Sequence, residues 1–472
     1  MVWLRWLLPP ASLILLLVSP AVFGLCRQDL ARAIAQEIQN PQWQRGQWGI
    51  VVRDLSSGEV LYNHQGEKLF LVASNVKLTT VAAALDYWGA SHRFVTTLSA
   101  RSPDRTTLRL QGSFDPSFSS QALQQMATSL AQQGIRQIQV LELGGVTPVT
   151  IEPTWAIEDL TMGNAAVILR LSINQNALNL EVRPQQLGQP LALRQPETNF
   201  RVVNETRTVA PSEPEFLESE VRGQQIIVRG QLHRGSEPAE MRIPLREPIP
   251  YLQQQVQRAF AQAGIQVQQI RPVETAEPLP DLLVRHASPP LGQLILPILQ
   301  ESDNFYAEML FAALEAAQPG YRQRYLAQIG VQGAVLVDGS GLSRQDWLTP
   351  NGLVTLLQQM ARTDHALLWR RSLPLAGRSG TLRQRLRDTA AQDRVWAKTG
   401  TLRGVAALAG YVEPLEDRPL VFSMVVNQAG ETTAHLRAGL DRMVVLLAQL
   451  RACDRASEVG GDRWGLGFHR HL

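Results

Sequence analysis

Lysine is nearly absent from this chain of 472 residues. Lysine and arginine together number 45, and only three of these are lysines, Lys68, Lys77 and Lys398. The net charge is only +3, and no run of basic residues occurs, so nucleic-acid binding is not indicated. Hydrophobic residues make up 44% and charged residues 18%, which is typical of a globular protein rather than a disordered one. The length allows two to four domains.

Several common catalytic motifs are missing as well. The chain contains no Gly-x-Ser-x-Gly nucleophile elbow, no His-Glu-x-x-His and no phosphate-binding loop that ends in Gly-Lys. These absences argue against an α/β-hydrolase, a zinc peptidase of that type and a P-loop enzyme. We expect neither a metal ion nor a cofactor. No internal repeat of fixed period is present, which argues against a repeat protein.

The first 24 residues resemble an export signal. Arg5 supplies a positive charge, Leu13–Val18 form an apolar core, and Val22–Gly24 offer a tolerable cleavage site. The alternative is an uncleaved membrane anchor, but three prolines interrupt the apolar stretch. A lipid anchor on Cys26 is disfavoured because Leu25 precedes it where a small residue is expected. We therefore predict an exported, periplasmic protein without a stable membrane anchor after cleavage.

Cysteine is as scarce as lysine. The two cysteines, Cys26 and Cys453, lie near the two ends of the predicted mature chain. An oxidising compartment permits a disulfide between them, and this bridge is our hypothesis. The alternative is two unrelated buried thiols.

The order of the predicted elements indicates a split domain. A helix over 28–39, strands over 48–55 and 59–63 and a helix over 75–88 come first. From 94 to 280 short alternating runs, among them Val167–Asn174, and two helices predict an inserted α/β region, which is too long and too patterned for a loop. Helices at 291–299 and 305–317, three strands between 394 and 426 and a helix at 433–450 follow. Residues 457–472 are predicted to be a disordered tail.

Two of the three lysines stand in short motifs. Ser74 and Lys77 form Ser-x-x-Lys, and Lys398, Thr399 and Gly400 form Lys-Thr-Gly. With 25 serines and three lysines, roughly 0.16 Ser-x-x-Lys matches are expected by chance. Between them lies Ser302-Asp303-Asn304 at a boundary between two predicted helices. Each motif alone is weak, because a serine at a helix start is usually a cap, but the three in this order are specific.

Spacing and chemistry suggest a role for each residue. Residues three apart on a helix share a face, so the Lys77 amine can reach the Ser74 hydroxyl and take its proton. Lys77 can act as a base if burial or a second cation lowers its pKa, and Lys398 could supply that cation. Ser302 could relay a proton to the leaving amine, and Asn304 could orient a peptide substrate.

The third motif supplies substrate contacts. An edge strand carrying Lys-Thr-Gly could pair with an extended peptide, and Gly400 would permit close approach. The Thr399 and Thr401 hydroxyls beside Lys398 suit a substrate carboxylate. The backbone N–H groups of Ser74 and Thr401 are the candidate oxyanion hole. A second Ser-x-Asn, at Ser172 and Asn174, falls in an alternating run and is interpreted as sheet surface.

These motifs resemble those of the penicillin-interacting serine acyltransferases. The first interval, 228 residues from Ser74 to Ser302, is far longer than in class A β-lactamases and is similar to that of the class C low-molecular-mass penicillin-binding proteins, the peptidase S13 family. Further similar stretches extend the resemblance over roughly residues 27–450; they are Ala84–Phe94, Ser302–Glu308, Val337–Ser343, Leu373–Arg385 and Lys398–Leu402.

The resemblance implies a fold and an activity. It implies an α+β fold with a transpeptidase-like catalytic domain, an antiparallel sheet covered by helices, at 25–93 and 281–456 and split by the insertion at 94–280. It also implies serine-type D,D-carboxypeptidase and D,D-endopeptidase activity on peptidoglycan stem peptides, inhibited by β-lactam antibiotics and needing no metal. The family's catalytic roles are carried onto the matching residues, which are Ser74, Lys77, Ser302, Asn304, Lys398, Thr399, Gly400 and Thr401.

Two alternatives remain open. A β-lactamase needs a carboxylate base for deacylation, typically in Glu-x-x-Leu-Asn, but Gln175 precedes the one Leu-Asn, Leu178-Asn179. We therefore expect a penicilloyl-Ser74 that hydrolyses slowly. The other alternative is a non-catalytic sensor of penicillin or cell wall, for which no signalling segment is visible.

Overall fold

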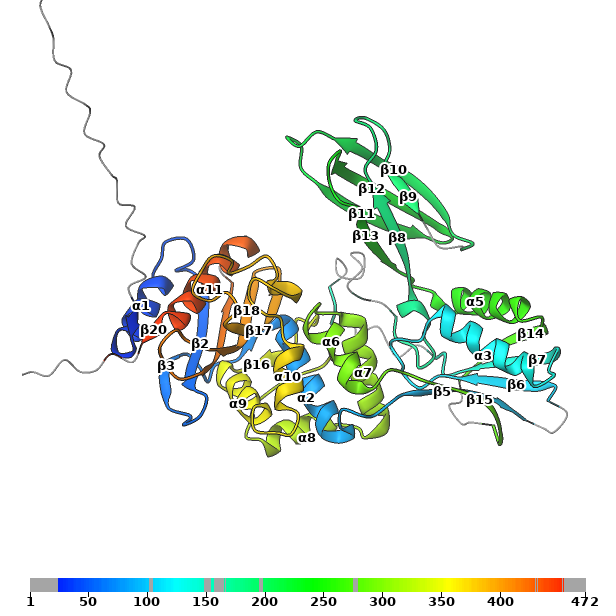
Figure 1. Ribbon diagram of the computed structural model, residues 1–472, viewed down its shortest axis with the longest axis horizontal. Helices are drawn as coiled ribbons and strands as arrows, with labels where there is room; N and C mark the ends of the chain where they lie inside the picture. The colour runs from blue at the N-terminus through cyan, green and yellow to red at the C-terminus, as the bar shows by residue number, and fades with distance from the viewer. Residues whose placement is uncertain are drawn as a thin grey trace, which may run out of the picture.

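The structure, a computed structural model, describes residues 24–101, 105–147, 154–156, 165, 167–194, 198–274, 279–428, 430, 432–451 and 453. The predicted export signal, apart from Gly24, and the predicted tail lie outside the described residues. The described part is elongated, with one large sheet at one end and the inserted region at the other (Figure 1).

The sheet at the first end has five strands, all antiparallel to their neighbours. Their order is β17 (Val395–Leu402), β18 (Val405–Val412), β19 (Leu420–Asn427), β2 (Gln47–Asp54) and β3 (Val60–His64). The sequence predicted each of these strands to within two residues. All eight residues of β18 and of β19 are buried, which explains their continuous apolar sequences. Strands from the two ends of the chain thus form one sheet.

Helices cover both faces of this sheet. On one face, α1 (Arg27–Ile38) and α11 (Thr433–Ala448) pack over a core that includes Ile50 and Val52 of β2. On the other face, Val51 belongs to a second core with α2 (Val76–Trp88) and α9 (Pro350–Met360). This alternation is that of a strand buried on both sides. Four more helices extend the second layer; they are α6 (Leu291–Leu299), α7 (Asn304–Ala317), α8 (Tyr321–Gln328) and α10 (Ala366–Ser372).

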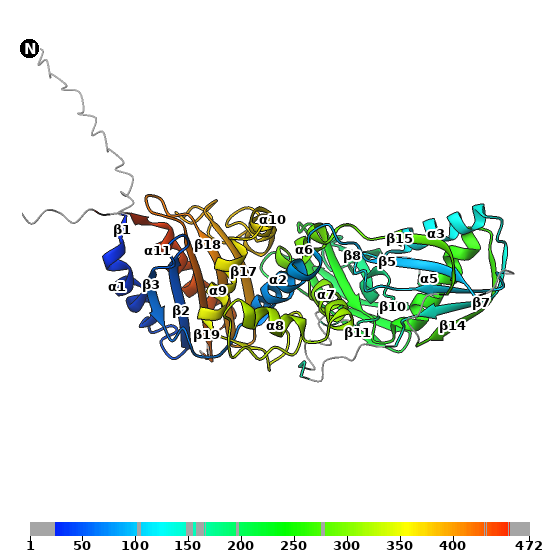
Figure 2. The same cartoon turned by 90° about the horizontal axis from the view of Figure 1, so that it is seen from below.

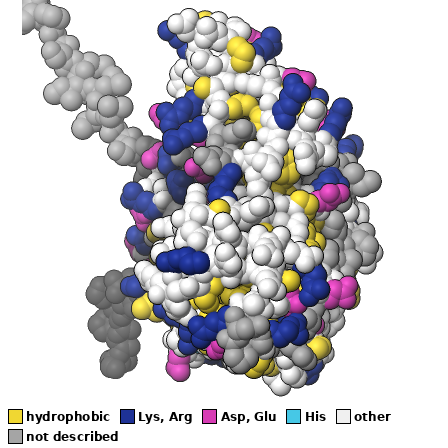
Figure 3. Space-filling view, turned by 90° about the vertical axis from the view of Figure 1, so that its right-hand side faces the viewer, with side chains coloured by type: hydrophobic (Ala, Val, Ile, Leu, Met, Phe, Trp, Pro, Cys, Tyr) yellow, Lys and Arg dark blue, Asp and Glu magenta, His cyan; other side chains and the backbone are white. Residues whose placement is uncertain are grey.

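The inserted region contains a mixed sheet of its own and an all-β part. The mixed sheet is ordered β14 (Gln266–Val273), β7 (Gln137–Gly144), β6 (Thr107–Gln111), β5 (Val95–Ala100) and β15 (Asp281–Ala287). Helices α3 (Ser120–Gln132) and α5 (Pro248–Gln262) share its hydrophobic core (Figure 2). Figure 3 shows basic side chains spread over this end of the molecule rather than gathered in one patch.

Two small sheets form the all-β part. Strands β10 (Arg201–Val209), β12 (Gln225–His233) and β11 (Phe216–Arg222) form one. Strands β13 (Ala239–Pro244), β8 (Ala177–Arg183) and β9 (Ala192–Arg194) form the other.

Two details differ from the sequence predictions. Strand β15 pairs with β5 inside the inserted sheet, so the chain leaves that sheet at Ala287 rather than at 280. Residues 167–173 form a loop with one isolated bridge residue instead of a strand, and Asn174 begins a short 3-10 turn, η2 (Asn174–Asn176). Ser172 turns inward, and its hydroxyl donates to the carbonyl of Leu169 at 2.8 Å. Asn176 also donates to the Ser172 hydroxyl, so Ser172 is a buried loop residue and not sheet surface. The division into independent domains stays a prediction.

The two ends of the described chain meet beside α1. Strand β1 (Leu25–Cys26) pairs in parallel with β20 (Leu450–Arg451), and Cys26 and Cys453 are joined by a disulfide in the structure. A short pair, β4 (Phe70–Leu71) with β16 (Trp347–Leu348), lies beside β19. Among the described residues, no helix is both long and apolar enough to cross a membrane.

Candidate active site

Ser74 lies in a short 3-10 turn, η1 (Ala73–Asn75), that leads directly into α2. Ala73 has a φ of 50°, in the left-handed region that a non-glycine residue adopts only where its surroundings enforce it. Two glycines provide that enforcement. A Cβ at Gly341 would lie 2.0 Å from the Ala73 carbonyl oxygen, and one at Gly400 would lie 2.4 Å from the Val72 carbonyl oxygen. The turn that carries Ser74 is therefore held between two close backbone contacts.

Lys77 is fully buried one turn further along, and its amine faces three oxygen atoms. The Nζ atom lies 2.9 Å from Ser74 Oγ, 2.6 Å from Asn304 Oδ1 and 2.7 Å from the Ser340 carbonyl oxygen. Burial lowers the pKa of Lys77 to about 8, although the nearby carboxyl groups of Asp338 and Glu308 act in the opposite direction. A neutral amine would donate to the two carbonyl-type oxygens and keep its lone pair for the Ser74 hydroxyl.

Lys398 is fully buried as well, and it is paired with Ser302. Its Nζ lies 2.8 Å from Ser302 Oγ and 2.9 Å from the Thr399 carbonyl oxygen. Burial, followed by the charge of Lys77, lowers the pKa of Lys398 well below the usual value. Of the two causes predicted to lower the pKa of Lys77, burial is the one that acts, and the charge of Lys398 is not needed. Ser302, between α6 and α7, has a φ of 62°, a second strained backbone at the site.

Strand β17 is at the edge of the sheet, and its register shows which backbone groups point outward. A two-residue turn joins Leu402 to Val405, so these two residues form the hydrogen-bonded pair next to the turn. Counting from this pair, every second residue of β17 directs its backbone N–H and C=O groups away from β18. Ala397 follows this alternation, because its N–H donates to the carbonyl of Pro374, outside the sheet. Thr399 and Thr401 have the same parity. The Thr401 N–H therefore lies on the open edge, where the proposed oxyanion hole requires it.

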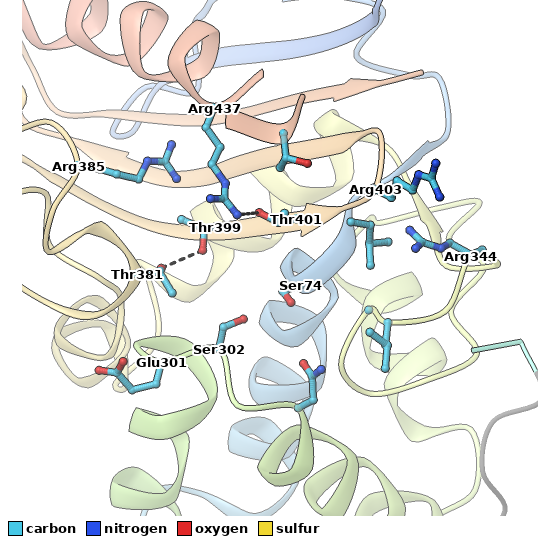
Figure 4. A pocket seen from close by; sticks show the side chains of 15 residues that line it. Ser74, Glu301, Ser302, Arg344, Thr381, Arg385, Thr399, Thr401, Arg403 and Arg437 are labelled. Carbon is cyan, nitrogen blue, oxygen red and sulfur yellow. Dashed lines mark hydrogen bonds between the residues drawn. The ribbon is translucent and has the colours of Figure 1, made fainter. Parts of the chain in front are cut away.

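These residues surround a cavity of about 850 Å³. Figure 4 shows the hydroxyl groups of Ser74, Ser302, Thr381 and Thr399 facing a common space. Thr399 Oγ1 donates to Thr381 Oγ1 at 2.8 Å. The further lining residues are Glu301, Asn304, Gly341, Leu342, Arg344, Arg385, Thr401, Leu402, Arg403, Thr433 and Arg437. Four arginines and a single carboxylate make the cavity suitable for an anionic ligand.

A loop between α8 and β16 completes the surroundings of Lys77. The Asp338 carboxylate accepts hydrogen bonds from the backbone N–H groups of residues 340–343, between 2.6 and 3.1 Å, and from the Trp155 indole at 2.8 Å. Although burial acts in the opposite direction, hydrogen bonding with the Asp346 side chain, followed by the bonds from Gly341, Trp155 and Ser343, lowers the pKa of Asp338. The loop so folded presents the Ser340 carbonyl to Lys77 and Gly341 to Ala73.

The inserted region contacts the Ser302–Asn304 motif directly. Asp303 caps α7, because its Oδ1 accepts the Tyr306 N–H at 3.0 Å. Its other oxygen accepts a hydrogen bond from Arg242 of β13 at 2.7 Å, and the Asp303 side chain is only 7% exposed. An arginine of the all-β part thus holds the residue between Ser302 and Asn304.

The structure brings together the catalytic residues predicted from the sequence. Ser74, Ser302, Asn304, Thr399 and Thr401 line the cavity. The two lysines lie behind this lining and reach it through Ser74 and Ser302. Gly400 contacts Val72 and Ala73 instead of lining the cavity. No cluster of potential metal ligands occurs among the described residues.

Several lining residues had no predicted role. Arg437 donates to Thr401 Oγ1 at 3.1 Å, and Thr381 bonds Thr399, yet both come from segments without a catalytic motif. The loop around Asp338 and the span containing Thr381 were noted only as stretches of family resemblance. That resemblance was the one signal that could have pointed to them.

Comparison with known proteins decides the family. The model of the D-Ala-D-Ala carboxypeptidase 3 (S13) family matches residues 30–450. The chain belongs to this family. A D-alanyl-D-alanine carboxypeptidase from Actinomadura sp. strain R39 is 31% identical in an alignment of 482 positions, which covers 94% of this chain and 89% of that protein.

Solved structures agree with the predicted fold. Penicillin-binding protein 4 (DacB) from Haemophilus influenzae matches with a TM-score of 0.73 at 23% identity, covering 88% of this chain and 98% of that one. The same protein complexed with a β-lactam matches with a TM-score of 0.69 at 22% identity, covering 89% and 98%. The predicted α+β, transpeptidase-like fold with a large insertion is confirmed.

Proposed function

We propose that this S13 family member removes the terminal D-alanine from peptidoglycan stem peptides, and opens D,D cross-links, through an acyl-Ser74 intermediate. The observation that carries the proposal is the pair of hydroxyl–amine contacts, Ser74 with Lys77 and Ser302 with Lys398, which face one cavity. Each reactive hydroxyl has a buried amine within hydrogen-bonding distance, as nucleophilic catalysis requires.

Acylation follows from these contacts. Neutral Lys77 takes the Ser74 proton as Oγ forms a bond to the carbonyl carbon of the penultimate D-alanine. The resulting oxyanion is stabilised by the N–H groups of Ser74 and Thr401. When the C–N bond breaks, the leaving amine of D-alanine receives a proton from the Ser302 hydroxyl, which Lys398 resupplies. Water then attacks the ester and its proton passes through Ser302 to Lys398. Protonated Lys77 returns its proton to Ser74 as the C–O bond breaks, so both amines regain their starting states and the shortened peptide leaves.

The lining favours substrates with a free carboxylate. Thr399, Thr401 and Arg437 offer hydroxyl and guanidinium donors beside Lys398. The C-terminal carboxylate of D-Ala-D-Ala fits this donor set. Backbone pairing along the outward groups of β17 would hold the peptide in an extended conformation.

Penicillins are proposed to acylate the same serine, and the penicilloyl-Ser74 ester is expected to hydrolyse slowly. Gln175 and Asn179, the residues nearest to a β-lactamase deacylation motif, line a different cavity. Glu301 is the one carboxylate lining the catalytic cavity, and Ser302 stands between it and Ser74 in Figure 4. None of these three residues supplies a carboxylate base next to Ser74. Action on peptidoglycan requires a protein outside the cytoplasm, and the predicted export signal supports this part of the proposal.

The test is release of D-alanine from a peptide that ends in D-Ala-D-Ala. We expect the wild-type chain to release one D-alanine per peptide and Ser74→Ala to release none. Lys68→Ala, a change at the lysine outside the motifs, is the matched control and should retain full activity. A wild-type chain that binds penicillin covalently but releases no D-alanine would favour the alternative of a non-catalytic sensor of penicillin or cell wall.

A further inference from the structure

A second cavity, of about 380 Å³, lies where the inserted region meets α7. The inserted region contributes nine lining residues, and α7 contributes Tyr306. None of the ten carries a side chain that is ionised at neutral pH, in contrast to the arginine-lined catalytic cavity. The lining residues are Pro116, Ser117, Phe118, Ser119, Asn174, Gln175, Ala177, Asn179, Tyr251 and Tyr306.

We propose that this cavity binds a neutral saccharide unit of the peptidoglycan strand whose stem peptide occupies the Ser74 cavity. The inference rests on the proposed function. Three aromatic rings, three carboxamides and four hydroxyls, two of them on tyrosines, are groups that recognise an uncharged, polyhydroxylated ring: the rings pack against its C–H faces, and the polar groups bond its hydroxyls. A free stem peptide carries carboxylates and suits the arginine-lined cavity instead.

The polar groups of this cavity are positioned before any ligand arrives. Asn174 Nδ2 donates to Ser120 Oγ at 2.6 Å and to the Tyr251 hydroxyl oxygen at 2.8 Å. Tyr251 is buried, and its O–H proton remains available for an acceptor in the cavity. Gln175 Oε1 is buried without a hydrogen-bond partner in the part of the chain that the structure describes. A sugar hydroxyl, which donates and accepts, would satisfy both groups once the Gln175 amide turns into the cavity.

The segment that carries Gln175 is strained. Asn174, Gln175 and Asn176 have φ values of 50°, 59° and 50°, all in the left-handed region. Side-chain bonds maintain this conformation, because Asn176 Nδ2 donates to the Val167 carbonyl at 2.7 Å and Asn174 Oδ1 accepts the Ser120 N–H at 3.0 Å. Such strain persists where the surrounding structure enforces it, and here it places Gln175 at the cavity.

The two cavities share a wall. Asn179 of β8 lies directly opposite Arg242 in the β8–β13 ladder, and Arg242 bonds Asp303. Asp303 lies between Ser302 and Asn304 of the catalytic cavity, and it accepts the backbone N–H of Tyr306. These contacts make the linings of the two cavities neighbours, as the proposed substrate, with a sugar and a stem peptide on one molecule, requires.

The experiment compares a D-Ala-D-Ala pentapeptide with the same peptide attached to its peptidoglycan disaccharide. For the wild-type chain we expect kcat/KM for D-alanine release to be about tenfold higher with the disaccharide, from contacts of the strength of one or two hydrogen bonds. The double change Gln175→Ala and Tyr251→Phe should remove this preference and leave kcat/KM for the bare peptide unchanged. Phe216→Ala, at an exposed aromatic of β11, is the control and should keep the preference.

Direct binding separates this proposal from the proposed function. Calorimetry with the disaccharide-tetrapeptide product, which needs no turnover, should show binding to wild type that is about tenfold weaker in the double variant. If the wild-type chain releases no D-alanine but still binds the product about tenfold more tightly than the double variant does, the proposed carboxypeptidase activity is overturned and the saccharide site is supported. Equal binding by wild type and double variant, or an undiminished disaccharide preference in the double variant, would overturn the saccharide site.

Discussion

The proposed base, Lys77, gives the sharpest prediction, because its proton must be absent before Ser74 can react. With a pKa of about 8, about one-tenth of the enzyme carries the neutral amine at pH 7. An ordinary lysine, with a pKa near 10.5, would be neutral in about one molecule in 3,000 at that pH. Burial of Lys77 therefore increases the reactive population about 300-fold, equivalent to about 3 kcal/mol.

The perturbation is pH, and the assay is the second-order rate constant for acylation by benzylpenicillin, measured by stopped flow from pH 6 to 9.5. We expect the rate to rise about tenfold per pH unit below 7.5 and to level off above about 8.5. The sign follows from the lowered pKa, since the active form of this base is the deprotonated one. Lys77→Arg should slow acylation at least 100-fold at every pH, because guanidinium stays protonated.

Two results would refute the reasoning. One is a rate of acylation that does not change between pH 6 and 8. The other is a Lys77→Arg variant that retains its rate within threefold while its thermal unfolding is unchanged. Either would mean that another group takes the Ser74 proton.

Three further predictions concern the support of the site. Arg242→Gln removes the ion-pair partner of the buried Asp303 carboxylate, so kcat/KM for D-alanine release should fall about threefold to tenfold and be partly restored in Arg242→Lys. Unchanged kinetics would show that this ion pair does not support the position of Ser302. Gly400→Ala forces a Cβ against the Val72 carbonyl, so acylation should slow by tenfold or more, and a rate equal to wild type would contradict the contact. Cys453→Ala should abolish the mobility shift on reduction and lower stability by about 2–4 kcal/mol, whereas two titratable thiols in the mature protein would exclude the bridge.

The strands and helices of the catalytic part were predictable because their signals are local. Eight-residue apolar runs such as Leu420–Asn427 specify buried strands wherever they occur in the chain. The candidate catalytic residues were selected for a different reason, since three short motifs in a fixed order indicate a chemistry; the structure places them around one cavity, and their roles stay a prediction. The alternating run at 167–174 misled the prediction, because the side chains of Ser172 and Asn176 bond nearby backbone groups and hold a loop.

What could not be predicted depends on contacts between distant segments. The peptide carbonyl that accepts from Lys77 comes from Ser340, 263 residues further along the chain. The ion pair between Arg242 and Asp303 joins an unremarkable arginine to a catalytic motif 61 residues away. Neither partner has a local pattern that reveals the other. The strained backbone at Ala73 is likewise held by close contacts with Gly341 and Gly400, which are distant in the sequence.

The most direct test of the central claim, that Ser74 is an acylated nucleophile, is intact-protein mass spectrometry of residues 25–472 after brief exposure to benzylpenicillin. We predict one stable adduct with the mass of one penicillin on the wild-type chain and none on Ser74→Ala. A folded wild-type chain that acquires no adduct would contradict the acyl-serine mechanism and favour a non-catalytic protein. An adduct that also forms on Ser74→Ala would place the nucleophile elsewhere.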